Sequence, residues 1–501
     1  MDAEELSSTG GEWAGRAVCV AGAGVSGRAA ARVLAERGAR VTVVEGRDGD
    51  EQRAHAAALE EHARGLPDGG GSITVRLGDG DTLPGGTELV VISPGWRPDA
   101  PLPRAAAAAG IEVYGEVELA WRLRPEGAAP WLAITGTDGK TTVVRMLACM
   151  LQAAGHDALA VGNVGTPIVE AVLEKHEVGG GPPSGGRRKR RVLAVELSSY
   201  QLHWSSSLAP IASAVLNLAP DHLDWHGSME EYAAAKAKIF QRCGTAVYNA
   251  DDPGSSGLAA GAGRRRAGFT LEVPGPGLLG VVDELLVDRA FTADPEREAA
   301  ELAALGDVRP FAPHNVANAL AAAALARAYG VPPEAVREGL RAFVPDPHRI
   351  QHVADAGGVT YINDSKATQP HAAAASLAAY ESIVWIAGGL LKGLEVDDLV
   401  RSCAPRLRGV VLMGRDRARI AEALARHAPD IPVVDVADTD TGAMDRVVNE
   451  AAALARPGDT VLLAPVGASF DMFANYPARG DAFIASVRRL PGAALPGEQP
   501  G

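Results

Sequence analysis

The segment ITGTDGKTT, at residues 134 to 142, has the residue types and spacing of a loop that binds nucleotide phosphates. It follows an apolar stretch and leads into a helix expected to begin near Thr141. Small residues let backbone N–H groups approach phosphate oxygens, the helix N-terminus adds positive potential, Lys140 supplies a mobile cation and Thr141 offers a magnesium ligand. Ile134 replaces the first glycine of GxxxxGK[ST], which leaves the shorter GxxGKT. We predict a mononucleotide-phosphate loop, because an ordinary glycine turn would not explain the Lys-Thr pair and the helix.

A second glycine-rich turn, GAGVSG at residues 22 to 27, matches GxGxxG after an apolar stretch. Glu45 ends the next expected strand, about where a ribose-binding acid lies in dinucleotide-binding folds. Alone, this pattern indicates NAD or FAD. The same turn can also receive the phosphates of another nucleotide, including a UDP-sugar, or serve only as a structural turn.

Carboxylates and imidazoles follow two later apolar stretches. Glu196 ends VLAVE, from where a carboxylate reaches ligands above a parallel sheet, although a buried acid without a ligand is the alternative. NLAPDHLDWHGS, at residues 217 to 228, adds Asp221, His222, Asp224 and His226. Oxygen and imidazole ligands together suit a divalent-metal site beside ATP.

Lys236 lies in EYAAAKAKIF, where an amphipathic helix is expected. The residues alone favour a surface lysine at this position.

The elements that must position these groups alternate between short apolar runs and alanine-rich helical stretches, which is typical of βαβ units around mainly parallel sheets. The fold class is therefore α/β. Expected strands cover residues 16–21, 40–45, 89–92, 131–135, 192–197, 212–217, 245–249, 359–363, 383–388, 409–413 and 460–464. Expected helices begin near Ser26 and Thr141 and cover 314–329 and 333–342.

Breaks in this alternation predict three domains, at residues 1–120, 121–345 and 346–501. The first break is RLRPEGAAP at 122–130, and the second is VPDPHR at 344–349. The stretch 178–191, VGGGPPSGGRRKRR, is expected to be a disordered surface insertion, and the tail PGAALPGEQPG is expected to be unstructured.

Composition limits the partners and the compartment. The 501 residues include 48 basic and 62 acidic side chains, for a net charge of −14, which argues against nucleic acid or an anionic membrane as the main partner. Cys19, Cys149, Cys243 and Cys403 form no CxxC pair and are expected to be reduced core residues. No apolar run approaches the roughly 20 residues that span a bilayer, and the acidic start MDAEELSSTGGEW does not suit a signal peptide. We expect a soluble, cytoplasmic protein.

The succession of motifs along nearly the whole chain resembles the Mur ligases of peptidoglycan synthesis. The third-domain motifs are similar to those of members that add D-glutamate. The matching segments are, in order, GAGVSG, SPG (93–95), GTDGKTT, GNVG (162–165), ELSSYQL (196–202), NLAPDHLDWHG, AAAKAKIF, HNVANALAA (314–322), PHR (347–349), NDSKAT (363–368), AGGLLKG (387–393) and PVGASFDMFANYPARG (465–480).

This resemblance implies a Rossmann-like first domain, a P-loop ATPase-like central domain and a Rossmann-like third domain, which bind the UDP-sugar, ATP and the amino acid in that order. It places the UDP substrate at Val25, Ser26, Glu45, Arg47, Gly95 and Asn163. It places ATP at Gly136, Thr137, Asp138, Gly139, Lys140, Thr141, Thr142, Asn315, Asn318, Arg349 and Asp364. It places D-glutamate at Lys366, Thr368, Lys392, Ser469 and Tyr476.

The resemblance also implies catalytic roles for Lys140, Glu196, His222 and Lys236. Thr141 and Glu196 would bind one Mg²⁺ ion, and His222 and Lys236 a second, with Lys236 carbamylated. The implied activity is ATP-dependent ligation of D-glutamate to UDP-N-acetylmuramoyl-L-alanine through an acyl phosphate, by a monomer.

Three alternatives compete with this interpretation. Another ligase of the superfamily would add a different amino acid or polyglutamylate a folate, but NDSKAT and GASFDMF favour D-glutamate. An NAD-dependent oxidoreductase is supported only by GAGVSG. A non-catalytic nucleotide-binding regulator would not need Lys140, Glu196, His222 and Lys236 together.

Overall fold

A computed structural model gives the fold of the chain and describes residues 11–163, 165–174, 191–438 and 442–495. Most of the predicted insertion (178–190) and the end of the predicted tail (496–501) lie outside these residues. Two edges of those predictions are wrong. Arg191 begins a strand, and Ala494 forms an antiparallel bridge with Asp355.

The first sheet is parallel and has the order β3-β2-β1-β4-β5 among the described residues. Alternate residues of β1 face opposite sides, so Val18 and Val20 join one apolar cluster while Cys19 and Ala21 join another. The strands are β1 Ala17–Ala21, β2 Arg40–Glu45, β3 Ser72–Leu77, β4 Leu89–Ile92 and β5 Glu112–Gly115. The helices are α2 Val25–Glu36, α3 Asp50–Arg64, α4 Pro101–Ala108 and α5 Glu116–Arg122.

The central sheet has the order β14-β13-β12-β11-β10-β9-β6-β8-β7 in the described part of the chain, and it is parallel except at β12-β13-β14. Its strands are β6 Trp131–Thr135, β7 Asp157–Gly162, β8 Arg191–Glu196, β9 Ala212–Val215, β10 Thr245–Asn249, β11 Arg265–Phe269, β12 Leu278–Val282, β13 Leu285–Asp288 and β14 Ala300–Ala304. Its helices are α6 Lys140–Ala153, α7 Ile168–Leu173, α8 Ser199–His203, α9 Leu223–His226, α10 Met229–Ala237, α11 Pro253–Ala259, α12 Pro313–Tyr329 and α13 Pro333–Ala342.

The third sheet has the order β15-β16-β20-β17-β18-β19 over the residues that the structure describes, with only the β15–β16 pair antiparallel. Trp385 of β17 faces a cluster with α14–α16, and its neighbour Ile386 faces a cluster with α17 and α18. The strands are β15 Gln351–Ala356, β16 Val359–Asn363, β17 Ile383–Gly388, β18 Leu407–Met413, β19 Val433–Asp435 and β20 Thr460–Val466. The helices are α14 Pro370–Leu377, α15 Asp397–Cys403, α16 Arg417–His427, α17 Ala443–Leu454 and α18 Tyr476–Arg488.

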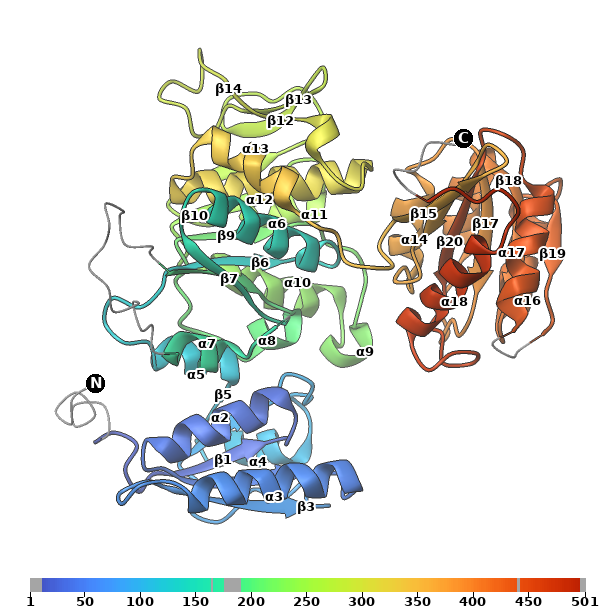
Figure 1. Cartoon of the computed structure of the whole chain (residues 1–501). Helices are drawn as coiled ribbons and strands as arrows, with labels where there is room; N and C mark the ends of the chain where they lie inside the picture. Colours follow the sequence, from blue (N-terminus) through green and yellow to red (C-terminus); the bar gives the residue numbers. More distant parts are fainter. Residues whose placement is uncertain (1–10, 164, 175–190, 439–441, 496–501) are drawn as a thin grey trace. The chain divides into compact units, whose positions relative to one another are not determined.

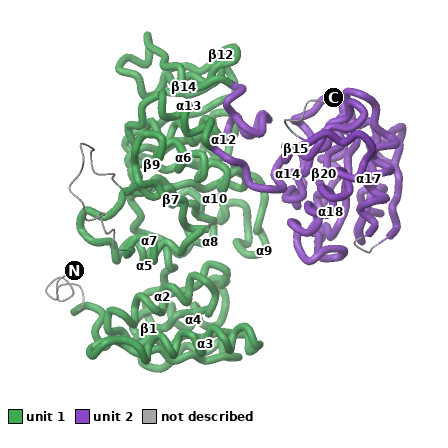
Figure 2. The backbone as a smooth tube through the Cα atoms, in the orientation of Figure 1, with its two compact units in different colours: residues 1–304, 318–342 green, residues 305–317, 343–501 purple. Residues whose placement is uncertain are grey.

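These three mainly parallel sheets confirm the predicted α/β class (Figure 1). The chain forms two compact units, residues 1–304 with 318–342 and residues 305–317 with 343–501 (Figure 2). The first unit holds two sheets, and the division into three domains, with its two boundaries, stays a prediction. No helix in the described ranges is long and apolar enough to cross a membrane. The four cysteines are free, as predicted, and Cys19, Cys243 and Cys403 lie in the core, but Cys149 is only half-buried, so its predicted core position is wrong.

Candidate active site

The phosphate loop connects β6 to α6 and is shaped by Asn217. The Asn217 side-chain oxygen accepts hydrogen bonds from the backbone N–H groups of Thr137 (2.9 Å) and Asp138 (2.8 Å). Gly139 caps α6 with φ +81°, and a Cβ there would lie 2.4 Å from Asn318 Oδ1. Only glycine fits this combination of backbone angle and close contact. The first turn of α6 then presents backbone N–H groups that have no earlier helical carbonyl to bind.

Lys140, the cation of this loop, folds back over it. Its Nζ donates to the carbonyl oxygens of Gly136 (2.9 Å) and Thr137 (2.7 Å). The ammonium group therefore lies directly above the backbone where nucleotide phosphates are predicted to bind.

Glu196, at the end of β8, is buried beside the loop, with 1 % of its surface exposed. Its Oε2 accepts a hydrogen bond from Thr141 Oγ1 at 3.0 Å, and its Oε1 accepts one from Asn163 Nδ2 at 2.9 Å. The parallel pairing of β6 with β8 places the ends of both strands at one sheet edge, which brings this hydroxyl and this carboxylate together. Asn163, predicted at the UDP substrate, contacts Glu196.

Lys236 contradicts the interpretation made from the residues alone, because it is not on the surface. It is 2 % exposed, its Nζ donates to the Gly136 carbonyl oxygen at 2.7 Å, and it lies 4.6 Å from the centre of the Tyr232 ring. Burial, together with the nearby charge of Lys140, lowers the pKa of Lys236 well below its ordinary value. The lysines of α6 and α10 thus converge on one loop carbonyl.

His222 precedes α9 in a left-handed conformation, with φ +55°. Its Nε2 lies 3.3 Å from Asp221 Oδ2. Burial lowers the pKa of His222, and the charges of Lys140 and Lys236 act in the same direction. His226 instead shares a hydrogen bond with Ser199 Oγ at 2.9 Å, and the backbone oxygen of Asp224 accepts from Arg97. In the described ranges no three His, Cys, Asp or Glu side chains are grouped to hold a metal ion.

The N-terminal glycine turn is held by Glu45 from the end of β2. Glu45 accepts hydrogen bonds from the backbone N–H groups of Ala23 (3.0 Å) and Arg47 (3.1 Å). Burial raises the pKa of Glu45, but these hydrogen bonds and the Arg47 charge outweigh it, so the pKa is lowered overall. A Cβ on Gly27 would lie 1.8 Å from the Gly22 carbonyl oxygen, which explains glycine at that position.

The second unit carries its own predicted site residues. Lys366 Nζ lies 4.3 Å from the Tyr476 ring, and Lys392, with φ +51°, lies 5.7 Å from the Phe470 ring. The Ser469 hydroxyl is buried and has no partner among the described residues. Burial raises the pKa of Asp364 to about 6.

Sequence reasoning gave no role to Arg479 or Asn217. Arg479 is 1 % exposed and donates to the Ser365 oxygens (3.0 and 2.9 Å) and to the Gly467 carbonyl oxygen (3.0 Å). It therefore ties the loop that carries Lys366 to the loop that carries Ser469. Asn217 lies in NLAPDHLDWHG and Arg479 in PVGASFDMFANYPARG, but the sequence alone does not show which polar atoms a buried side chain binds.

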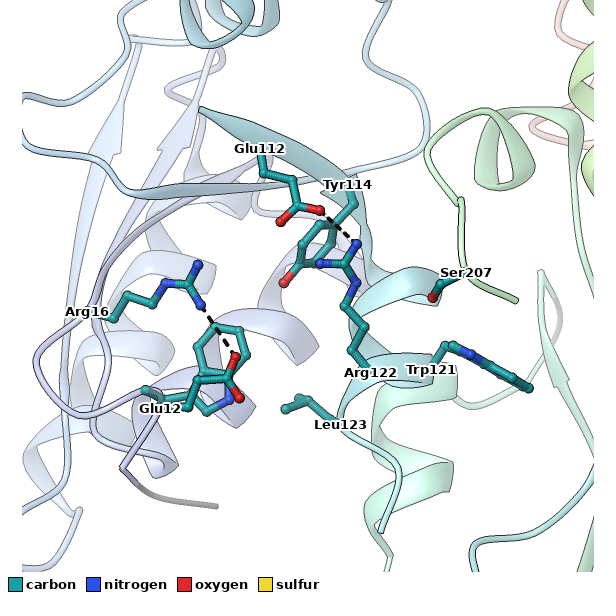
Figure 3. Close-up of a pocket in the computed structure, with 9 residues that line it drawn as sticks. Glu12, Arg16, Glu112, Tyr114, Trp121, Arg122, Leu123 and Ser207 are labelled. Carbon is teal, nitrogen blue, oxygen red and sulfur yellow. Dashed lines mark hydrogen bonds and ion pairs between the residues drawn. The ribbon is translucent and has the colours of Figure 1, made fainter. Parts of the chain in front are cut away.

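A pocket of about 480 Å³ in the first unit contains none of the predicted site residues (Figure 3). It is lined by Glu12, Trp13, Arg16, Glu112, Tyr114, Trp121, Arg122, Leu123 and Ser207. Arg16 is paired with Glu12 and Arg122 with Glu112, so these arginines are already neutralised, and we assign no function to this pocket.

The fold and the site together define a nucleotide-binding α/β protein in which a phosphate loop, a buried carboxylate and a buried lysine meet. Comparison with known proteins is consistent with this class. The model of the Mur ligase middle domain matches residues 134–326, and the model of the Mur ligase glutamate ligase domain matches residues 348–467. The chain belongs to the Mur ligase family.

Similar curated proteins include two named UDP-N-acetylmuramoylalanine--D-glutamate ligase. That of Thermobifida fusca is 61% identical over 484 residues, covering 96% of this chain and 100% of that protein. That of Streptomyces avermitilis is 61% identical over 483 residues, covering 95% and 99%.

Solved structures share the fold at low sequence identity. The UDP-N-acetylmuramate-alanine ligase MurC of Thermotoga maritima is 18% identical, with a TM-score of 0.51, covering 94% of this chain and 99% of that one. A pseudomurein peptide ligase type C from Methanothermus fervidus is 16% identical, with a TM-score of 0.52 and the same coverage.

Proposed function

We propose that this chain joins D-glutamate to UDP-N-acetylmuramoyl-L-alanine in an ATP-dependent step of peptidoglycan precursor synthesis, as a cytoplasmic monomer. The observation that carries the proposal is the convergence of Lys140, Lys236 and the Thr141–Glu196 pair on one phosphate loop. The names of the relatives at 61% identity support the choice of substrates. An NAD-dependent oxidoreductase would leave these residues without a role.

A carboxylate is a poor acyl donor and must be activated. The terminal carboxylate of the UDP substrate attacks the γ-phosphorus of ATP, and ADP leaves. The amine of D-glutamate then attacks the acyl carbon, and phosphate leaves as the amide forms. Lys140, now on the loop carbonyls, moves to the phosphate oxygens and offsets their charge.

The residues beside the loop fit magnesium. Thr141 Oγ1 and Glu196 Oε2, 3.0 Å apart, are oxygens of the kind that Mg²⁺ prefers, and we assign them to one ion. His222 and Lys236 are assigned to a second ion, with Lys236 as a carbamate. Bound Mg²⁺ supplies charge stabilisation during phosphoryl transfer.

The remaining predicted residues are assigned to substrates. Lys366 and Lys392 pair with the two carboxylates of D-glutamate, with help from Thr368, Ser469 and Tyr476. The UDP portion binds at the GAGVSG turn and at Gly95. Asn315, Asn318, Arg349 and Asp364 face the nucleotide.

The test is an assay of the purified chain with ATP, Mg²⁺, UDP-N-acetylmuramoyl-L-alanine and D-glutamate, L-glutamate or neither. Phosphate release with a product heavier by one glutamyl residue is expected only with D-glutamate. Turnover only with another amino acid or acceptor would refute the substrate assignment. Absence of ATP cleavage with every combination would refute the ligase.

A further inference from the structure

The one-turn helix α9 lies between two functional regions of the first unit. The residue before it, His222, has a left-handed backbone conformation, which is unfavourable for a residue other than glycine. Such a conformation persists only where the surroundings fix it. The contacts of α9 therefore decide how His222 is presented.

On one side, aromatic contacts fix α9 to α8, which follows the Glu196 strand. The Trp225 ring, in a residue 8 % exposed, lies 4.8 Å from the Tyr200 ring and 5.1 Å from the His203 ring, centre to centre. His226 adds its hydrogen bond to Ser199 and packs 5.3 Å from Tyr232 of α10, the helix that carries Lys236. Helices α8, α9 and α10 are labelled in Figure 1.

On the other side, two hydrogen bonds join α9 to the loop after β4 in the first sheet. Trp225 Nε1 donates to the Gly95 carbonyl oxygen at 3.2 Å, and Arg97 Nη1 donates to the Asp224 carbonyl oxygen at 2.7 Å. Helix α9 and the loop after β4 belong to the same compact unit. The Trp225 side chain thus contacts both Gly95, in the loop after β4 (the Gly95 loop), and the aromatic residues Tyr200 and His203 of α8.

We propose that Trp225 is a positioning residue that couples binding of the UDP portion at the Gly95 loop to nucleotide binding at the His222–Lys236 end of the phosphate site. The proposal rests on the proposed function, because that function assigns ligands to the two regions. When the UDP portion fixes the Gly95 loop, the hydrogen bond from the Trp225 indole N–H to the Gly95 carbonyl oxygen also fixes α9. Each ligand then favours the other, and the coupling is reciprocal.

Two matched variants separate the hydrogen bond from the aromatic packing. Trp225→Phe keeps an aromatic ring against Tyr200 and His203 but loses the N–H donor. Trp204→Phe is the control, because Trp204 borders the same cluster, 4.9 Å from His203, and its buried Nε1 has no hydrogen-bond partner among the described residues. The same chemical change is therefore made with and without loss of a hydrogen bond.

The experiment is calorimetric titration of UDP-N-acetylmuramoyl-L-alanine into the full chain, with and without a non-hydrolysable ATP analogue and Mg²⁺. In the wild type the analogue should tighten binding of the UDP compound. Trp225→Phe should reduce that tightening about three- to tenfold, the range for one neutral hydrogen bond, and Trp204→Phe should keep it.

Equal tightening in the wild type and Trp225→Phe, or no tightening in the wild type, would overturn the proposal. No binding of the UDP compound to the wild type would instead refute the proposed function. If Trp225→Phe does not fold, Arg97→Ala tests the same link, because Arg97 is half exposed and joins the same two elements. It should reduce the tightening, and an unchanged value would overturn the proposal.

Discussion

Two lysine side chains donate to the same carbonyl oxygen, that of Gly136. Two ammonium charges this close repel each other, and the buried partner, Lys236, has the lowered pKa. A neutral amine is the form of lysine that reacts with carbon dioxide. The geometry therefore gives a physical reason for a carbamate at Lys236 and for a cation at Lys140.

Replacing Lys140 with alanine is predicted to reduce product formation by about 10²- to 10³-fold, because the cation that offsets developing phosphate charge is lost. The rate of phosphate release under saturating substrates measures this. The thermal unfolding midpoint of the variant should stay close to that of the wild type. Activity within a few-fold of wild type would contradict the role of Lys140.

The proposed carbamate at Lys236 can be tested directly. The chain equilibrated with carbon-13 bicarbonate should show a carbamate carbonyl signal by NMR, and Lys236→Arg should abolish it. Lys238→Arg is the matched control, because Lys238 lies two residues away and burial also lowers its pKa, yet it donates to the His203 carbonyl oxygen. A signal that survives Lys236→Arg would place the modification elsewhere.

At the scale of elements, two buried carboxylates of α5 hold it to α7 and to the loop between α8 and β9. Glu118 accepts from the backbone N–H groups of Ser206 (2.9 Å) and Ser207 (3.0 Å), and Glu116 accepts from the Val169 N–H at 2.6 Å. Neither residue belongs to a motif that predicts function. Their burial depends on which elements meet in three dimensions, which local sequence patterns do not encode.

Glu116 makes this junction sensitive to pH. Burial raises its pKa from 4.5 to about 7, although hydrogen bonds from Val169 and Ile168 oppose the shift. Between these values the folded state binds more protons than the unfolded state, so the unfolding free energy falls as pH rises, by about 3 kcal/mol in total above pH 7.

Glu116→Gln should remove this slope, since glutamine keeps an acceptor oxygen and carries no charge. Urea unfolding at pH 5 and pH 8 measures the effect. The variant should be more stable than wild type at pH 8 and similar to it at pH 5. Glu126→Gln, at an exposed position, should follow the wild type. A Glu116→Gln variant that is as pH-dependent as the wild type would contradict this account.

At the scale of the whole molecule, the predicted strands of the three sheets were found where apolar residues run without interruption. β2, β4, β6, β10, β16 and β17 have the predicted bounds. β3, β5, β11 to β15 and β19 were not predicted. AELAA of β14 has no strand-like alternation and forms a strand only by pairing with β13. The segment DALAVG of β7 was also missed, because its alanine and glycine residues have little preference for strands.

Only part of the candidate site could be predicted from the sequence. The loop with Lys140 follows from local sequence, because strand, glycine turn and helix must be contiguous. The burial of Lys236 and the bonds of Asn217 to the loop did not follow, because they depend on the packing of segments about 80 to 100 residues apart.

The most direct test of the acyl-phosphate mechanism uses UDP-N-acetylmuramoyl-L-alanine whose terminal carboxylate carries oxygen-18, incubated with the chain, ATP, Mg²⁺ and D-glutamate. Each released phosphate should carry one oxygen-18 atom, because a carboxylate oxygen attacks the γ-phosphorus, and the UDP product should be heavier by one glutamyl residue. Release of unlabelled phosphate alongside that product, or phosphate release without it, would contradict the acyl-phosphate mechanism.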